Sequence, residues 1–227
     1  MGFLIGIDSG GTATKAAVID PQGRTLGTAA RNVQVLEPHP AWSERDMEAM
    51  WRDTCAVVRE ALAAAHLSGD AVDGIACTGH GNGLYLIDAA GQPVRHAINS
   101  TDQRAADIIR TWQADALDAR VLPLTAQSLW AAQPNALLAW LQTHEPQSLA
   151  RASRLLMAKD YIRFRLTGIA AMEETDMSAT SLMNVPDGTY DDRLLAWFGI
   201  SEAKRLLPPL VKRNAEPRQQ TVVVGPV

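Results

Sequence analysis

"IGIDSGGTATKAAVID", residues 5–20, places an aspartate and two glycines between two apolar runs. An apolar run that stops at a glycine pair and then resumes predicts two antiparallel strands joined by a tight turn. Together with the next run, the sequence predicts three short strands over Phe3–Asp8, Thr14–Ile19 and Thr25–Val33. We expect these strands to form an antiparallel meander whose Asp8–Lys15 tip faces an open cleft.

The rest of the chain alternates between strand and helix patterns. From residue 46 the apolar spacing becomes helical, and Ser43 with Asp46 predicts a capping-box start for this helix. Strands followed by alternating strands and helices predict an α/β domain built on a mixed sheet. The further predicted elements are a helix over Asp46–Ala65, strands in 72–79 and 83–91, helices over Asp102–Ala114 and Ala126–Thr143 (interrupted by Pro134), and a strand running into a helix over 154–168, closed by Gly168.

The composition of the chain argues against nucleic-acid-binding, membrane and secreted proteins. Of the 227 residues, 47% are hydrophobic and 20% are charged, and the formal net charge is -4, which offers no basic surface to nucleic acid. No apolar run reaches the roughly 18 residues of a membrane span, and no secretion signal opens the chain. The cysteines, Cys55 and Cys77, are interpreted as free thiols, a disulfide between them being the less favoured alternative. We therefore expect a cytoplasmic protein without membrane or nucleic-acid partners.

The glycine turn after the first strand has its own chemistry. Exposed backbone N–H groups at a glycine pair form a concavity suited to phosphate. Asp8 cannot bind phosphate directly, because like charges repel, but it can hold Mg²⁺ that bridges to phosphates. Thr12 adds a hydroxyl and Lys15 a positive charge. The alternative is an ordinary hairpin with a solvated aspartate, and the turn is not a Walker loop, since no G-K-[ST] opens a helix.

Several motifs in order resemble one family. The opening stretch resembles the first phosphate-binding element of the actin-like ATPase superfamily. "PAWSERDMEAMW" (40–51), "VDGIACTGHGNGLYLIDAAGQPVRHAINSTDQRA" (72–105), "LLAWLQTHEPQSLARASRLLMAKDYIRFRLTG" (137–168) and "EETDMSATSLMNV" (173–185) resemble landmarks of the FGGY carbohydrate kinases. The resemblance covers essentially the whole chain and is strongest to the L-xylulose kinase branch. It implies a ribonuclease-H-like α/β fold.

The resemblance also implies a function: phosphorylation of a sugar or polyol hydroxyl, with ATP and Mg²⁺ as cofactors. Such a reaction needs mainly positioning and charge neutralisation from the protein. Arg104 would hold the Asp102 carboxylate in place. The implied site residues are Gly10, Gly11, Thr12 and Lys15 for the nucleotide, Asp8 for the metal, and His80, Gly81, Asn82 and Asp102 for the sugar.

Structural alternatives stand beside these roles. His80 fits an ordinary loop, Asn82 fits a left-handed turn, and Asp102 fits the N-cap of its helix. Asp160 is interpreted as a cap, and Trp42 as the tryptophan that meets the ligand or a second domain.

Two positions depart from the family pattern. Ser100 stands where many members have a substrate-stacking tryptophan, and Gly11 stands where many have threonine. Ser100 predicts a smaller or more polar substrate face, which favours pentuloses or short polyols over hexoses.

The family has two similar domains, and this chain resembles the first. Residues 1–227 are expected to be the N-terminal, sugar-binding domain, with the catalytic-base aspartate lying beyond Val227 and the C-terminal kinase domain as the missing partner. The chain alone is expected to be inactive or nearly so. Two alternatives are a hexokinase-type phosphotransferase and a non-catalytic module that binds a sugar or a partner. We also expect self-association as a homodimer through the terminal Thr221–Val227 strand or the cleft face. The alternative is a monomer whose last strand is disordered.

Overall fold

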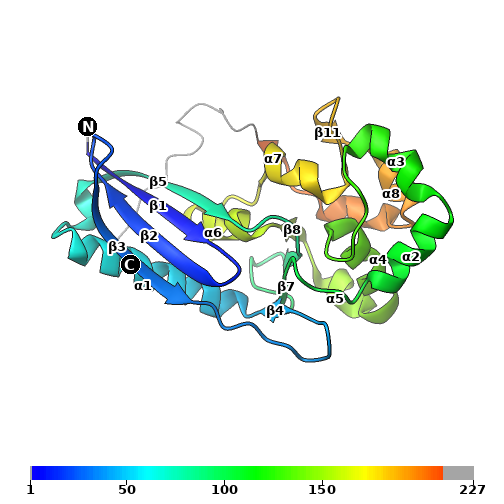
Figure 1. Ribbon diagram of the computed structural model, residues 1–227, viewed down its shortest axis with the longest axis horizontal. Coiled ribbons are helices and arrows are strands. Elements are labelled where there is room, and N and C mark those ends of the chain that lie inside the picture. Colours follow the sequence, from blue (N-terminus) through cyan, green and yellow to red (C-terminus); the bar gives the residue numbers. More distant parts are fainter. Residues whose placement is uncertain (1, 212–227) are drawn as a thin grey trace.

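The computed structural model describes residues 2–211, and a four-stranded sheet lies at one end of it (Figure 1). Strands β1 (Phe3–Ser9), β2 (Ala13–Ile19), β3 (Thr25–Asn32) and β5 (Val72–Gly79) lie in the order β3-β2-β1-β5. β2 is antiparallel to both β1 and β3, whereas β5 is parallel to β1. The predicted antiparallel meander within a mixed sheet is therefore confirmed.

The two faces of this sheet differ because side chains alternate along each strand. Ile5 and Ile7 of β1 and Val18 of β2 are almost completely buried against helices α1 (Met47–Ala64) and α6 (Ala158–Thr167). Gly6 and Asp8 alternate with the isoleucines and face the other way. On that second face, residues of the four strands line a shallow depression of about 670 Å³.

Helix α1 lies directly on β3. A Cβ atom on Gly27 would come within 2.3 Å of the Ala61 carbonyl oxygen, so only glycine allows this approach. The helix begins one residue from the predicted start, after Asp46, whose side chain accepts hydrogen bonds from the N–H groups of Glu48 and Ala49. The predicted capping role of Ser43 is wrong, because its own N–H donates to Asp102 instead.

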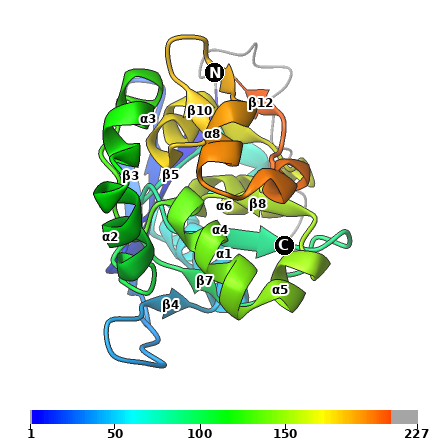
Figure 2. The same ribbon diagram turned by 90° about the vertical axis from the view of Figure 1, so that its right-hand side faces the viewer.

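A second hydrophobic core lies away from the sheet and is enclosed by helices (Figures 1 and 2). The helices around it are α2 (Ala106–Ala114), α3 (Leu117–Thr125), α4 (Pro134–His144), α5 (Pro146–Arg151), α7 (Glu174–Met177) and α8 (Asp192–Trp197). The short strands are β4 (Glu44–Arg45), β6 (Tyr85–Ile87), β7 (Ala97–Ile98), β8 (Arg154–Leu156), β9 (Met172–Glu173), β10 (Met183–Asn184), β11 (Thr189–Tyr190) and β12 (Leu210–Val211). Single 3-10 turns cover Gly69–Ala71, Ser178–Thr180 and Ser201–Leu206.

Two predicted helices begin later than expected. The helix predicted from Asp102 begins at Ala106, because residues 102–105 form a turn in which Asp102 accepts the Arg104 N–H. The helix predicted over Ala126–Thr143 begins at Pro134, whose fixed φ suits a first helical position. Asp102 is therefore not the N-cap of its helix.

The strand-to-helix prediction over 154–168 is confirmed as β8 followed by α6. Gly168 ends the helix in the left-handed conformation, with φ of 73°. Asp160 does not cap α6; it lies inside the first turn, buried, with ion pairs to Lys159 and Arg163.

Two expectations from composition can also be compared with the structure. Cys55 and Cys77 are free thiols, as predicted, and burial raises the pKa of Cys77 to about 12. Within residues 2–211, no helix is both long and apolar enough to cross a lipid bilayer.

Candidate functional site

A cleft opens between the β1–β2 turn and three loops of the chain. We call it the hairpin cleft; its volume is about 500 Å³. The cleft brings the predicted phosphate turn (Gly11, Thr12) and the predicted sugar residue His80 to one space, beside Trp42 and Ser100. Its remaining lining residues are Val35, Glu37, Ala41, Ser43, Asn99, Thr101 and Gln103. The predicted open cleft at the hairpin tip is confirmed.

The β1–β2 turn presents its backbone to this cleft. The Gly10 N–H donates to the Ala13 carbonyl at 3.0 Å and closes the turn. A Cβ atom on Gly11 would meet no atom within 4 Å, so the space above the turn is open. An unshielded turn of this kind leaves room for an anion against the backbone N–H groups.

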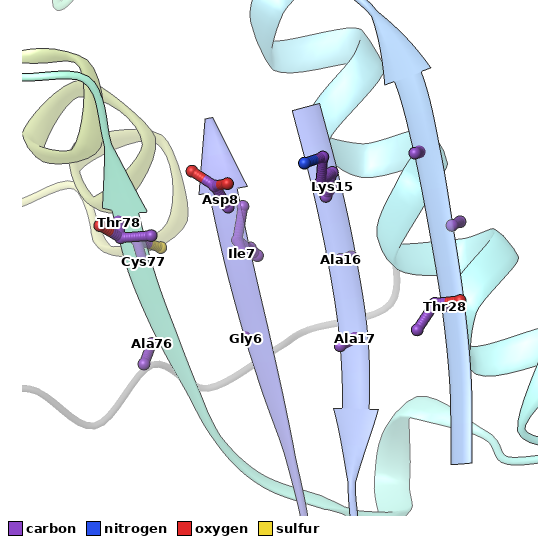
Figure 3. A pocket seen from close by; sticks show the side chains of 12 residues that line it. Gly6, Ile7, Asp8, Lys15, Ala16, Ala17, Thr28, Ala76, Cys77 and Thr78 are labelled. Carbon is purple, nitrogen blue, oxygen red and sulfur yellow. The ribbon is translucent and has the colours of Figure 1, made fainter. Parts of the chain in front are cut away.

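Asp8 and Lys15 lie one step back from the turn, as register partners on adjacent strands. Figure 3 shows both side chains on the uncovered face of the sheet, with Thr78 of β5 on the other side of Asp8. Residues 2–211 hold no group of three or more metal-ligating acid, histidine or cysteine side chains. A single carboxylate with open space around it fits Mg²⁺, which keeps several waters and completes its shell from phosphates.

The loop after β5 carries unpartnered polar atoms. The Nε2 atom of His80 lies 2.9 Å from the Tyr85 hydroxyl, while Nδ1 is buried and has no hydrogen-bond partner among residues 2–211. Burial lowers the pKa of His80, so the ring is neutral near pH 7. Asn82 adopts the left-handed conformation (φ 61°), as its structural alternative predicted, and its buried Oδ1 also lacks a partner within the described residues. The orphaned nitrogen of His80 fits a hydroxylated ligand in the cleft, whereas Gly81 and Asn82 are not among the residues that line it.

Asp102 lies beneath the cleft rather than at its surface. Its side chain is fully buried, and each carboxylate oxygen accepts two hydrogen bonds. Arg104 supplies three of these four, so its predicted role in holding Asp102 is confirmed. The Arg104 guanidinium also lies 4.0 Å from the ring centroid of Trp42, which lines the cleft. Direct contact of Asp102 with a sugar stays a prediction that this packing does not favour.

A charged cluster supports the His80 loop from behind. Lys159 pairs with Asp160, Glu173 and Asp176, and a Cβ atom on Gly81 would lie 3.5 Å from an Asp176 carboxylate oxygen. Burial raises the pKa of Asp160 to about 6. The sequence pattern singled out the segments of this cluster but not the pairing, because the partners lie on separate elements.

The sequence interpretation also missed Arg45 of β4. Its guanidinium is buried beneath the β1–β2 turn and donates to Ser9 Oγ (3.1 Å), the Gly10 carbonyl (3.4 Å) and Thr14 Oγ1 (2.8 Å). A charged residue between Trp42 and the start of a helix was the available signal.

Comparison with known proteins agrees with this geometry. Residues 3–220 match the N-terminal domain of the FGGY family of carbohydrate kinases. The chain belongs to this family. The L-xylulose/3-keto-L-gulonate kinase of Escherichia coli is 40% identical over 209 residues, which are 92% of this chain and 42% of that protein. A probable L-xylulose kinase of Pasteurella multocida is 36% identical, over 94% of this chain and 44% of its own length.

A solved structure shares both fold and sequence with this FGGY domain. The xylulose kinase from Rhodospirillum rubrum superposes with a TM-score of 0.84 and is 26% identical, over 92% of this chain and 42% of that one. The FGGY domain thus has the α/β fold of the sugar kinases, as the resemblance implied. It spans about two fifths of the length of these relatives.

Proposed function

We propose that this FGGY domain is the sugar-binding half of a kinase that transfers the γ-phosphoryl group of ATP to a hydroxyl of a sugar or polyol. One observation carries the proposal: the open turn at Gly11 and Thr12 and the orphaned nitrogen of His80 belong to one cleft. Phosphoryl transfer requires donor and acceptor to be held together with little covalent work by the protein, and a shared cleft meets that need.

The position of each group around the hairpin cleft supports the following proposed roles. The N–H groups of Gly11 and Thr12 would bind phosphate oxygens, and Lys15 would neutralise charge from the neighbouring strand. Gly10, predicted as a third donor, instead shapes the turn, because its N–H is bonded to the Ala13 carbonyl. Asp8 would hold Mg²⁺, which supplies charge neutralisation at the phosphates when bound. His80, the Gly81 backbone and Asn82 would bind the sugar, with Asp102 fixing the loop at Ser43 beneath them.

A pentulose such as L-xylulose is the proposed substrate. The support is the L-xylulose kinase branch of the resemblance together with Ser100, which leaves a small polar wall in the cleft. We also propose that turnover requires the part of the kinase that this chain does not span, including the catalytic base. Free thiols and the use of ATP favour a cytoplasmic site of action.

The second candidate is a non-catalytic module that binds a sugar or a partner protein. The unpartnered Nδ1 of His80 fits this candidate too, since a domain can bind a ligand without carrying out catalysis.

One sample tests both candidates: calorimetry over a panel of pentuloses, polyols and hexoses, and an ADP-release assay coupled to a reporter enzyme. We expect sugar binding with L-xylulose tightest and no turnover. Turnover would show that the site is complete, whereas a clear preference for a hexose would contradict the pentulose assignment. Absence of binding to every member of the panel would contradict the proposed sugar site.

A further inference from the structure

Arg45 is a buried cation that forms no ion pair within the part of the chain that the structure describes. Asp53, a carboxylate whose charge acts on Arg45, pairs with Arg31 instead. The Arg45 side chain is 3% exposed, and within residues 2–211 no carboxylate lies within 4.0 Å of the guanidinium. Its neighbours in the sequence, Glu44 and Asp46, are used elsewhere: Glu44 pairs with Arg95 and Arg104, and Asp46 caps α1. A buried charge without a partner is costly, so this arrangement calls for an anion that the fold itself does not supply.

The Arg45 guanidinium lies near both predicted ligand sites of the hairpin cleft, the phosphate turn and the His80 loop. It donates to Ser9, Gly10 and Thr14, which frame the β1–β2 turn. Its charge also acts on the fully buried hydroxyl of Tyr85, which lies 2.9 Å from Nε2 of His80. A continuous row of polar groups therefore runs from the turn through Arg45 and Tyr85 to His80.

The positive charge of Arg45 favours one direction for the hydrogen bond between Tyr85 and His80. A guanidinium can only donate, so the Tyr85 hydroxyl is most stable with its oxygen toward Arg45 and its proton toward His80 Nε2. Burial raises the pKa of Tyr85 to about 12, so the hydroxyl keeps that proton. In this orientation His80 carries its own proton on Nδ1, the atom without a partner among the described residues.

We propose that Arg45 and Tyr85 are positioning residues that link the phosphate turn to the sugar loop: Arg45 gives the turn its positive charge, and Tyr85 fixes His80 with its Nδ1–H free to donate to a sugar hydroxyl. The inference rests on the proposed function and adds a physical connection between its two ligand sites. An anion bound at the turn would supply the missing counter-charge, and the change would reach His80 through Tyr85.

The test is ¹⁵N NMR of the His80 ring in the unmodified chain, Tyr85→Phe and Arg45→Gln, with Arg110→Gln as a charge-matched control on an exposed side chain. We expect the unmodified chain and the control to hold the Nδ1–H tautomer. Tyr85→Phe and Arg45→Gln should give a mixture of tautomers. Tyr85→Phe removes a single oxygen, so it decides the question even where Arg45→Gln does not fold. A His80 spectrum that neither substitution changes would overturn the proposal.

Binding of inorganic triphosphate with Mg²⁺ then tests whether an anion at the turn uses the Arg45 charge. We expect the triphosphate affinity, measured by calorimetry, to fall about tenfold in Arg45→Gln and to stay unchanged in Arg110→Gln. Triphosphate should shift the His80 signals of the unmodified chain but not those of Tyr85→Phe. Equal affinity in Arg45→Gln would overturn the role of Arg45. If the unmodified chain binds neither triphosphate nor sugar, the proposed function fails. The His80 tautomer measured by NMR then still decides whether Arg45 and Tyr85 position His80.

Discussion

At the scale of single residues, His80 decides how the cleft meets a sugar. Replacing it by alanine removes a half-buried, neutral hydrogen-bonding group whose Nδ1 atom has no partner among the described residues. We expect His80→Ala to weaken L-xylulose binding about tenfold, the effect of one well-formed hydrogen bond. Calorimetry measures it, with His96→Ala, on a half-exposed side chain, as the control. Equal sugar affinity in His80→Ala and the unmodified chain would show that His80 is an ordinary loop residue.

Asp160 predicts a dependence of stability on pH. Because its folded-state pKa, about 6, lies above the ordinary 3.8, the folded protein retains a proton that the unfolded chain releases. The stability from this group is present below about pH 4 and is lost as the pH rises through 6. Urea unfolding should therefore show the unmodified chain losing on the order of 2 to 3 kcal/mol between pH 4 and pH 7, relative to Asp160→Asn. Asp70→Asn, at an exposed carboxylate, should show no such relative loss; a parallel pH profile for Asp160→Asn would contradict the prediction.

At the scale of elements, Gly27 sets the distance between α1 and β3. Valine at this position would push against the Ala61 carbonyl, so we expect Gly27→Val to lower the free energy of unfolding by about 3 kcal/mol. Gly6→Val is the matched control, since a Cβ atom there meets nothing within 4 Å. Its effect should stay within about 0.5 kcal/mol. Chemical denaturation compares the two, and equal stabilities would mean that α1 can move away from the sheet without loss.

Elements whose ends are set by local chemistry could be predicted from the sequence, and the others could not. The meander strands end within one residue of the prediction, because glycine and proline turns bound them. Helix α2 begins four residues late because the turn at Asp102 depends on Ser43, a residue far away in the chain.

The candidate site could likewise be predicted from the sequence only in part. Its glycine turn and the His80 loop are visible as patterns. Arg45 and Tyr85 acquire their roles from partners on other strands, which no local pattern displays.

At the scale of the whole molecule, the predicted homodimer remains to be tested. Its proposed contact, Thr221–Val227, lies outside the described residues. We expect light scattering over a concentration series to detect dimers, because strand segments without a partner tend to pair with another copy. Val223→Lys should abolish them by placing a charge in an apolar contact. A strict monomer at high concentration, unchanged by this substitution, would exclude the association.

The order of the strands has a consequence for how the chain acquires its structure. β1, β2 and β3 are consecutive, and α1 follows after the two-residue strand β4, so their mutual packing closes only short loops. The pairing of β5 with β1, in which Val72 lies beside Phe3, instead closes a loop of the whole intervening chain. Contacts between neighbouring segments form faster than distant ones. During refolding, pulsed hydrogen exchange should therefore protect the amides of β2 and α1 before those of β5, so that the phosphate turn exists before the loop that carries His80.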